Sequence, residues 1–205
     1  MSPSFFWLTL LSLTKHSPAE TQAQFDTNVF GLLNVTRAFL PYFRAQRSGV
    51  IGNVSSIGAW RGGAGIGLYC TSKWAVSGIS ETLTYELADF NIKVCAIEPG
   101  YFRSNFLNPG NRLAAKAHIP DYDGTASRKA AAGLEAYNNN QPGDIKKGAK
   151  VMVDVLTSSG VAAGKEVPLR LALGTDAYGI ITGKCQNTMS LLDEWKHIST
   201  TTDHE

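Results

Sequence analysis

The sequence predicts an α/β fold with a parallel sheet, and three observations support this expectation. Residues 49–56 form a short, mostly apolar stretch bounded by polar segments. Residues 69–90 then repeat apolar side chains with a helical period, and residues 92–100 form a second apolar run that ends at Pro99 and Gly100. An apolar strand, a helix and a second apolar strand are typical of a parallel βαβ unit with a right-handed crossover.

A long helix is expected before this unit and a loop-rich segment after it. Apolar residues recur with a 3.6-residue period over residues 18–47, and Ser17 or Thr21 can cap the start of that helix. Residues 103–143 are rich in Asn, Gly, Pro and Ala and break the period, apart from a possible helix at 125–137. We interpret this region as an excursion from the sheet.

The C-terminal part returns to regular elements. Asp144 is expected to cap a helix that runs through Leu156, and residues 167–174 form a third candidate strand. A last helix is expected over residues 175–197, and residues 198–205 are interpreted as a frayed tail.

Composition places the chain among ordinary globular proteins with one domain. It has 205 residues, of which 43% are hydrophobic and 18% charged, and a net charge of +2. No basic block stands out, so nucleic acid is not an expected partner. The three cysteines and four histidines are scattered, which favours no disulfide framework and no metal site, and fits a reducing, cytoplasmic location.

The N-terminal residues 1–16 are atypical because residues 5–13 are almost entirely apolar. This run is shorter than the roughly 20 apolar residues needed to cross a bilayer, and no Lys or Arg precedes it as in a signal peptide. We therefore expect no membrane span, and we interpret the run as a strand or helical turn in the core.

The residues that can carry chemistry lie around the first strand and the following helix. Tyr69 and Lys73 are four residues apart at the expected helix start, so their side chains share one face. An ammonium group and a helix N-terminus both stabilise a phenolate, so we expect a lowered pKa for Tyr69. Ser56 ends the preceding strand, where it can hydrogen-bond a substrate oxygen while Tyr69 donates a proton.

The order of these pieces resembles the classical short-chain dehydrogenase/reductase family. The matching stretches are "FDTNVFG", "GVIGNVSSIG", "YCTSK", "IKVCAIEPGYFRS" and the C-terminal "PLRLALGTDAY". The resemblance implies a three-layer Rossmann-like parallel sheet with helices on both faces. It makes the chain, residues 1–205, a single partial domain truncated at its N-terminus.

The resemblance also assigns roles to individual residues. Tyr69 matches the general acid/base, Lys73 the lysine that binds the nicotinamide ribose, and Ser56 the ligand of the substrate oxygen, with Ser55 as the fallback. Asn28 matches an asparagine that holds a proton-relay water. The segment that lines the nicotinamide is matched by four residues, Pro99, Gly100, Phe102 and Ser104.

The implied activity is NAD(P)-dependent interconversion of a ketone or aldehyde and an alcohol. The cofactor would be NADP or NAD, with NADP slightly favoured. Two alternatives remain open: a non-catalytic scaffold or dimerisation protein, and a non-redox isomerase or dehydratase that uses the same tyrosine. The resemblance further implies a dimer or tetramer formed through helices 18–47 and 69–90.

The glycine-rich βαβ unit that holds the cofactor phosphates in this family is missing from the sequence. Only 27 residues precede Asn28, and the pattern G-x-x-x-G-x-G does not occur. The glycines between Gly58 and Gly65 lie between the serine and the tyrosine, so we interpret them as a spacer. Strand 49–56 would then be an unpaired edge, with which residues 5–13 could pair.

The substrate is expected to be a small carbonyl or alcohol compound of apolar character. Residues 103–143 occupy the place of the family's substrate loop. Aromatic and aliphatic side chains in and beside this region would contact the ligand, namely Tyr101, Phe106, Leu107, Leu113 and Tyr122.

Overall fold

The computed structural model describes residues 8–10, 17–108, 111–114 and 118–204. At its centre lies a parallel sheet with the order β2 (Gly49–Val54), β3 (Ile92–Pro99), β5 (Arg170–Leu173). The expected βαβ unit and the third strand are therefore confirmed.

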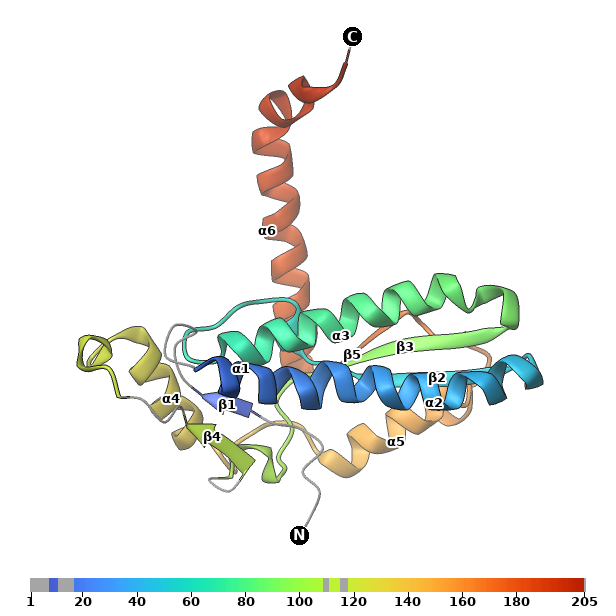
Figure 1. The fold of residues 1–205 in the computed structure, drawn as a ribbon, viewed down its shortest axis with the longest axis horizontal. Helices are drawn as coiled ribbons and strands as arrows, with labels where there is room; N and C mark the ends of the chain where they lie inside the picture. The colour runs from blue at the N-terminus through green and yellow to red at the C-terminus, as the bar shows by residue number, and fades with distance from the viewer. Residues whose placement is uncertain (1–7, 11–16, 109–110, 115–117, 205) are drawn as a thin grey trace.

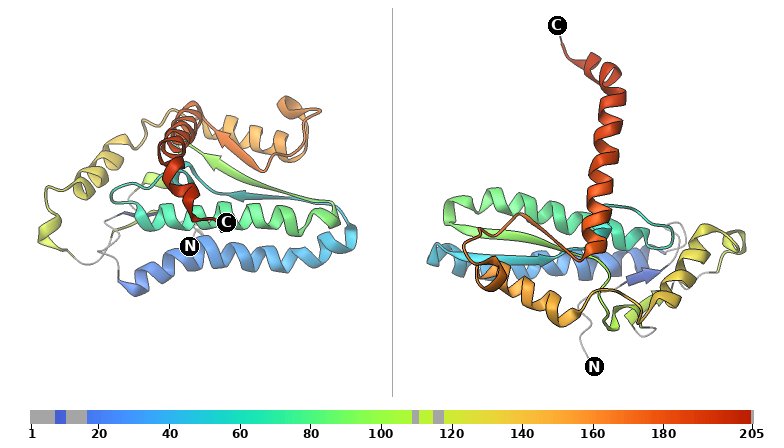
Figure 2. Two further views of the ribbon diagram at one scale, coloured as in Figure 1. Left: turned by 90° about the horizontal axis from the view of Figure 1, so that it is seen from above. Right: turned by 180° about the vertical axis from the view of Figure 1, so that it is seen from behind.

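Helices cover both faces of this sheet, as Figure 2 shows. On one face α3 (Gly67–Glu86) and α2 (Gly31–Gln46) pack on Val94 of β3, and on the other α5 (Ile145–Leu156) packs on Cys95 and Ile97. Neighbouring residues of β3 point to opposite faces, so both faces of this strand are buried. The three-layer, Rossmann-like arrangement is thus confirmed.

The long N-terminal helix forms as expected but contains a π-helical turn. It begins with α1 (Pro18–Phe25), where Ser17 and Glu20 form a capping box, and continues through Asp26–Phe30 with π-helical hydrogen bonding into α2. It ends at Arg47, which adopts a left-handed conformation. The apolar pattern of this helix contains no indication of the π-helical turn.

The N-terminal strand pairs with a different segment from the one expected. Strand β1 (Leu8–Leu10) lies parallel to β4 (Arg112–Ala114) in a separate two-stranded sheet. The pairing of residues 5–13 with β2 is therefore wrong for the described part of that run, while residues 5–7 and 11–13 lie outside it. Within the described residues β2 is an edge strand, as expected.

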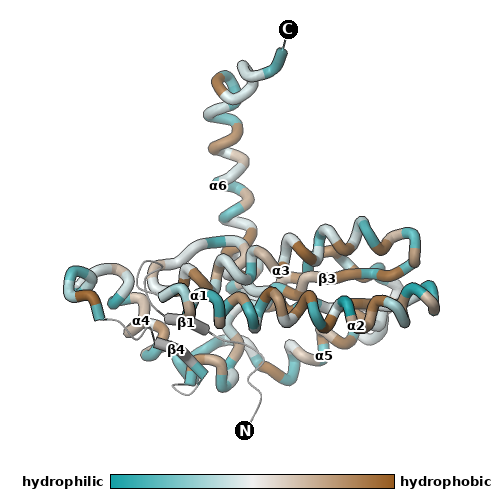
Figure 3. The backbone as a smooth tube through the Cα atoms, in the orientation of Figure 1, coloured by the Kyte–Doolittle hydropathy of each residue, from teal (hydrophilic) through white to brown (hydrophobic). Residues whose placement is uncertain are grey.

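The C-terminal part contains α4 (Ala126–Tyr137), α5 and α6 (Thr175–Ser199), close to the expected bounds. The expected tail is wrong in its first part, because α6 continues through Ser199 and a 3-10 turn follows at Thr200–Thr202. Helix α6 projects from the body (Figure 1), and apolar and polar residues alternate along it (Figure 3). Other 3-10 turns lie at Ile57–Ala59, Ala88–Phe90, Asn105–Leu107, Pro120–Tyr122 and Gly160–Ala162.

None of the helices in the described ranges combines the length and the apolar composition needed to cross a bilayer.

Candidate active site

A cavity of about 410 Å³, which we call the active-site cavity, lies where β2 and β3 end. The carboxyl ends of parallel strands are where open α/β sheets bind ligands. The cavity wall includes almost all of the residues singled out from the sequence, namely Ser55, Ser56, Tyr69, Lys73, Pro99, Gly100, Phe102 and Ser104.

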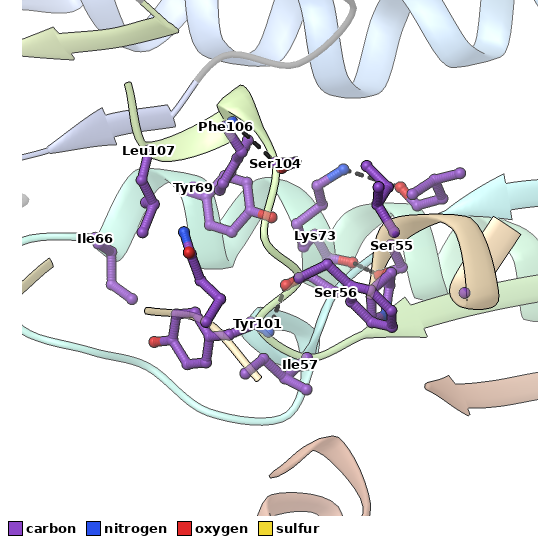
Figure 4. A pocket seen from close by; sticks show the side chains of 18 of the residues that line it. Ser55, Ser56, Ile57, Ile66, Tyr69, Lys73, Tyr101, Ser104, Phe106 and Leu107 are labelled. Carbon is purple, nitrogen blue, oxygen red and sulfur yellow. Dashed lines mark hydrogen bonds between the residues drawn. The ribbon is translucent and has the colours of Figure 1, made fainter. Parts of the chain in front are cut away.

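Tyr69 and Ser56 lie close together in this cavity (Figure 4). Tyr69 is in the first turn of α3, and Ser56 caps the 3-10 turn that follows β2, where its Oγ accepts a hydrogen bond from the Gly58 amide at 3.0 Å. The Tyr69 ring packs at a tilt on Phe106, with 5.7 Å between ring centroids. A Cβ on Gly58 would lie 3.3 Å from the Tyr69 ring, so a glycine suits this close approach.

The two adjacent serines have different surroundings. The Ser55 hydroxyl donates to the Lys73 carbonyl at 3.0 Å and shares a hydrogen bond with Ser77 at 2.8 Å, both inside the protein. The hydroxyl of Ser56 interacts with Tyr69 instead. Ser55 therefore ties strand β2 to helix α3, while Ser56 faces the tyrosine.

Lys73 is almost completely buried, with 2% of its surface exposed. Its Nζ donates to the Val54 carbonyl at 2.9 Å and lies 5.7 Å from the centroid of the Tyr69 ring. Burial disfavours the charged ammonium and lowers the pKa of Lys73 from 10.5 to about 7. A modest change in surroundings can thus switch this lysine between its neutral and charged forms near neutral pH.

The expected lowering of the Tyr69 pKa is wrong for this structure. Burial of the phenol raises its pKa above the usual range, and the opposing hydrogen bond with Ser56 is a smaller effect. The expectation counted the nearby lysine as a full positive charge, but burial also weakens that charge. Tyr69 is therefore protonated at neutral pH, the form in which it can donate a proton.

Asn28 lies in the π-helical turn and is buried rather than facing solvent. Its Nδ2 donates to Ser72 Oγ at 3.0 Å, and Ser72 in turn donates to the Tyr69 carbonyl at 2.7 Å. Within the described residues its Oδ1 has no hydrogen-bond partner. Single π-helical turns are frequent at functional sites. Asn28 lines a second hollow together with Lys73 rather than the active-site cavity.

The segment after β3 is held from two sides. The Gly143 amide donates to the Tyr101 carbonyl at 3.0 Å, and the Arg103 amide donates to the Gly143 carbonyl at 2.9 Å. The Tyr101 amide donates to the Asp176 carboxylate of α6 at 2.7 Å. A Cβ on Gly100 would collide with this carboxylate, so a larger residue there would displace Asp176 from the Tyr101 amide.

Glu98 is a buried carboxylate near the cavity whose role the sequence analysis did not predict. Glu98 accepts hydrogen bonds from Trp60 at 2.7 Å, Ser77 at 2.9 Å and Arg170 at 2.8 Å. Since Ser77 also bonds to Ser55, this network joins all three strands behind the serine pair. The only sign of this network in the sequence is Glu98 itself, one acidic residue within an apolar strand.

The predicted substrate-contact residues are only partly brought together. Tyr101, Phe106 and Leu107 line the cavity, which fits an apolar ligand. Tyr122 does not line it and lies in a 3-10 turn, and the side chain of Leu113 is outside the described part of the chain. The cavity also includes Gln141 and Met152, which sequence reasoning missed.

Comparison with known proteins places the chain in a family. The family model of the short chain dehydrogenases matches residues 10–112. The chain is 33% identical over 178 residues to oxidoreductase BOA17 from Botryotinia fuckeliana, and 36% identical over 155 residues to a 3-ketodihydrosphingosine reductase from Bacteroides thetaiotaomicron. A solved short-chain dehydrogenase from Streptomyces avermitilis superposes with a TM-score of 0.80 at 32% identity, over 97% of this chain and 69% of that one.

The chain therefore belongs to the short-chain dehydrogenase family. These matches cover 86% and 76% of this chain but only 61% and 55% of the two curated relatives. The range matched by the family model includes Ser56, Tyr69 and Lys73 of the cavity wall.

Proposed function

We propose that the chain carries the catalytic part of an NAD(P)-dependent oxidoreductase that interconverts a ketone or aldehyde and an alcohol. The observation that carries this proposal is the meeting of Ser56, protonated Tyr69 and buried Lys73 at the wall of one mostly apolar cavity. Proton donors at one point of an apolar cavity suit a carbonyl oxygen, which gains negative charge as it is reduced.

In the reducing direction Tyr69 donates its proton to the carbonyl oxygen, and the Ser56 hydroxyl hydrogen-bonds the same oxygen. A nicotinamide held beside Lys73 and the segment from Pro99 to Ser104 would supply the hydride that the carbonyl carbon receives. Lys73 in its protonated form stabilises the phenolate that this step leaves, and a pKa near 7 makes that form accessible at neutral pH. In the reverse direction the phenolate removes the alcohol proton.

Several residues fit the nicotinamide end of the cofactor. The segment from Pro99 to Ser104 lines the cavity beside Lys73, and the buried, unpartnered Oδ1 of Asn28 can accept a hydrogen bond from a bridging water on the other side of Lys73. We assign NADP or NAD as the cofactor, with NADP slightly favoured.

Two measurements on the full chain test this proposal. Tyr69→Phe should lower turnover of a medium-chain ketone with NADPH by about 10²- to 10⁴-fold, since it removes the proton donor. Tyr178→Phe, at an exposed position of α6, is the matched control and should change turnover little. Unchanged turnover in Tyr69→Phe would refute the catalytic assignment.

Fluorescence titration with NADPH separates the catalytic proposal from a scaffold role. Saturable micromolar binding is expected for the catalyst. Absence of binding would instead support the second candidate, a non-catalytic dimerisation protein. The observation that favours this candidate is an exposed apolar stripe on α2, formed by Val35, Phe39 and Tyr42.

Both candidates include self-association through the helices at 18–47 and 69–90, as a dimer or tetramer. Exposed Trp74 and Tyr85 on α3 add to the stripe on α2. We also propose a cytoplasmic location, which free Cys70, Cys95 and Cys185 support.

A further inference from the structure

Gln141 is a buried polar residue in the wall of the active-site cavity, and none of the roles above uses it. Its side chain is 1% exposed, and its Oε1 atom has no hydrogen-bond partner within the described residues. A buried acceptor without a partner is unfavourable, so such atoms in native proteins usually await a ligand or a water.

The orientation of the Gln141 amide follows from its neighbours. The backbone amide of Asn139 donates to one side-chain atom of Asn138 at 3.1 Å, so that atom is the carbonyl oxygen Oδ1. The same oxygen faces Gln141 and accepts from its Nε2 at 3.4 Å. The other end of the Gln141 amide is therefore an acceptor.

Asn138 itself is fixed by the opposite side of the substrate loop. Its Nδ2 donates to Asn108 Oδ1 at 2.9 Å, and Asn108 Nδ2 donates to Asn105 Oδ1 at 3.2 Å. The side-chain amides thus form a hydrogen-bonded row that begins at Gln141. Each amide donates to the next, in the order Gln141, Asn138, Asn108 and Asn105. The backbone of Gln141 is also held, because Arg103 donates to its carbonyl at 3.2 Å.

Besides Ser56 and Tyr69, the polar side chains in the cavity wall include Arg61, Lys73, Tyr101 and Ser104. Apolar side chains surround the rest of the space, including Ile66, Phe106, Leu134, Ile145 and Met152. Within the described residues Gln141 Oε1 is a buried acceptor of this wall without a partner, and such an atom can select one polar group on a ligand.

We propose that Gln141 Oε1 accepts a hydrogen bond from a second polar group of the substrate, a hydroxyl or N–H remote from the reacting carbon. The substrate class is then an apolar ketone or alcohol that carries such a donor. Asn138 is a positioning residue that acts through Gln141. This inference rests on the proposed function of the cavity, but it concerns binding and is tested without turnover.

The experiment measures ligand binding to the full chain by isothermal titration calorimetry without cofactor. The ligands are a series of nonanediols from 2,5- to 2,9-nonanediol, in which the second hydroxyl moves along the chain. Each diol is compared with the compound in which that second hydroxyl is converted to a methyl ether. The ether keeps the oxygen but lacks the donor. For the diol of matching length, the wild type should bind the diol about 3- to 10-fold more tightly than the ether. The corresponding amino-2-nonanols distinguish an N–H donor from a hydroxyl.

Gln141→Met keeps the side-chain length and removes the acceptor, so it should abolish the preference for the diol while binding of the ether persists. Asn138→Ala should reduce the preference, because it frees the Gln141 amide to rotate. Asn140→Ala is the matched control, since Asn140 is exposed on the same loop and its side chain donates to the Ala136 carbonyl rather than to Gln141. If Gln141→Met does not fold, as judged by circular dichroism, Asn138→Ala decides the question.

The proposal is overturned if the wild type does not distinguish diol from ether, if no member of the series binds, or if both variants weaken diol and ether equally. Tyr69→Phe distinguishes this result from a failure of the proposed function. A diol preference that depends on Gln141, combined with unchanged turnover in Tyr69→Phe, would refute only the catalytic role.

Discussion

Two hollows meet at Lys73, and they are built in different ways. The active-site cavity, of about 410 Å³, draws its walls from many segments between Val54 and Met152. The second hollow, of about 660 Å³, is lined apart from Lys73 only by residues 27–43 of the long helix and 50–54 of β2. We call it the edge groove, since it follows the side of that strand on which the described part of the chain provides no partner strand.

The difference shows which hollow is shaped for a ligand. Hydrogen bonds between segments far apart in the sequence hold the surroundings of the active-site cavity, such as those from Trp60 and Arg170 to Glu98 and from Arg103 to the Gln141 carbonyl. The edge groove has apolar, half-exposed walls such as Val35 and Phe39, and it runs along the edge of β2 that has no neighbouring strand among the described residues. Strand edges of this kind favour association with further polypeptide. We therefore expect substitutions behind the cavity to affect folding far more than those in the groove.

The largest effect is expected from Glu98→Leu. The substitution leaves Trp60 and Ser77 without their acceptor and Arg170 without its buried counter-charge. A buried donor left without its acceptor, here Ser77, costs about 1–3 kcal/mol, while Arg170 keeps its pair with Glu81. Urea denaturation should show a decrease of this size in the free energy of unfolding.

Glu81→Leu is the matched control for that measurement. Glu81 also pairs with Arg170, at 3.2 Å, but 43% of its side chain is exposed. Solvent screens such a pair, so its loss should cost less than about 1 kcal/mol. Equal decreases in the free energy of unfolding of the two variants would show that the hydrogen bonds of Glu98 do not stabilise the fold more than an exposed ion pair does.

The second prediction concerns the pH dependence of stability through Lys73. Its pKa is about 7 in the folded chain, against 10.5 for a lysine in water, so between these values the unfolded chain binds more protons. Stability therefore rises with pH through this window and is lost as pH falls toward 7. Relative to Lys73→Met, the free energy of unfolding of the wild type should rise by about 2 kcal/mol between pH 7.5 and pH 9.

Parallel pH profiles for the two proteins would contradict this prediction, since they would mean that the lysine is equally protonated in both states. The profiles should be compared below pH 10. Above that value the raised pKa of Tyr69 has the opposite effect, because the folded chain then holds a proton that the unfolded chain loses.

Much of the fold could be predicted because its signals are local. The apolar runs at 49–54 and 92–99, the helical period of α3 and the Asp144 cap are all readable within short windows. The pairing of Leu8–Leu10 with Arg112–Ala114 was not predictable, because two three-residue strands carry no pattern that selects a distant partner.

The site divides in the same way. Ser56, Tyr69 and Lys73 are linked by fixed spacings along one strand–helix unit, so the sequence indicated them together. Glu98 could not be predicted because its partner Arg170 lies far along the chain. Gln141 could not be predicted because it joins the cavity wall only when the loop is folded. The pKa of Tyr69 was misjudged because burial depends on the whole fold.

The smallest effect on folding is expected from Val35→Ser in the edge groove. Val35 is 60% exposed, so the substitution should change the free energy of unfolding by less than about 0.5 kcal/mol. Val76→Ser, at a fully buried position of α3, is the contrasting control and should cost at least about 2 kcal/mol.

If the stripe on α2 is covered by a second copy, Val35→Ser should still weaken self-association measured by sedimentation velocity. If both self-association and stability are unchanged, the edge groove is not part of the proposed interface. A large loss of stability would instead show that Val35 packs in the hydrophobic core.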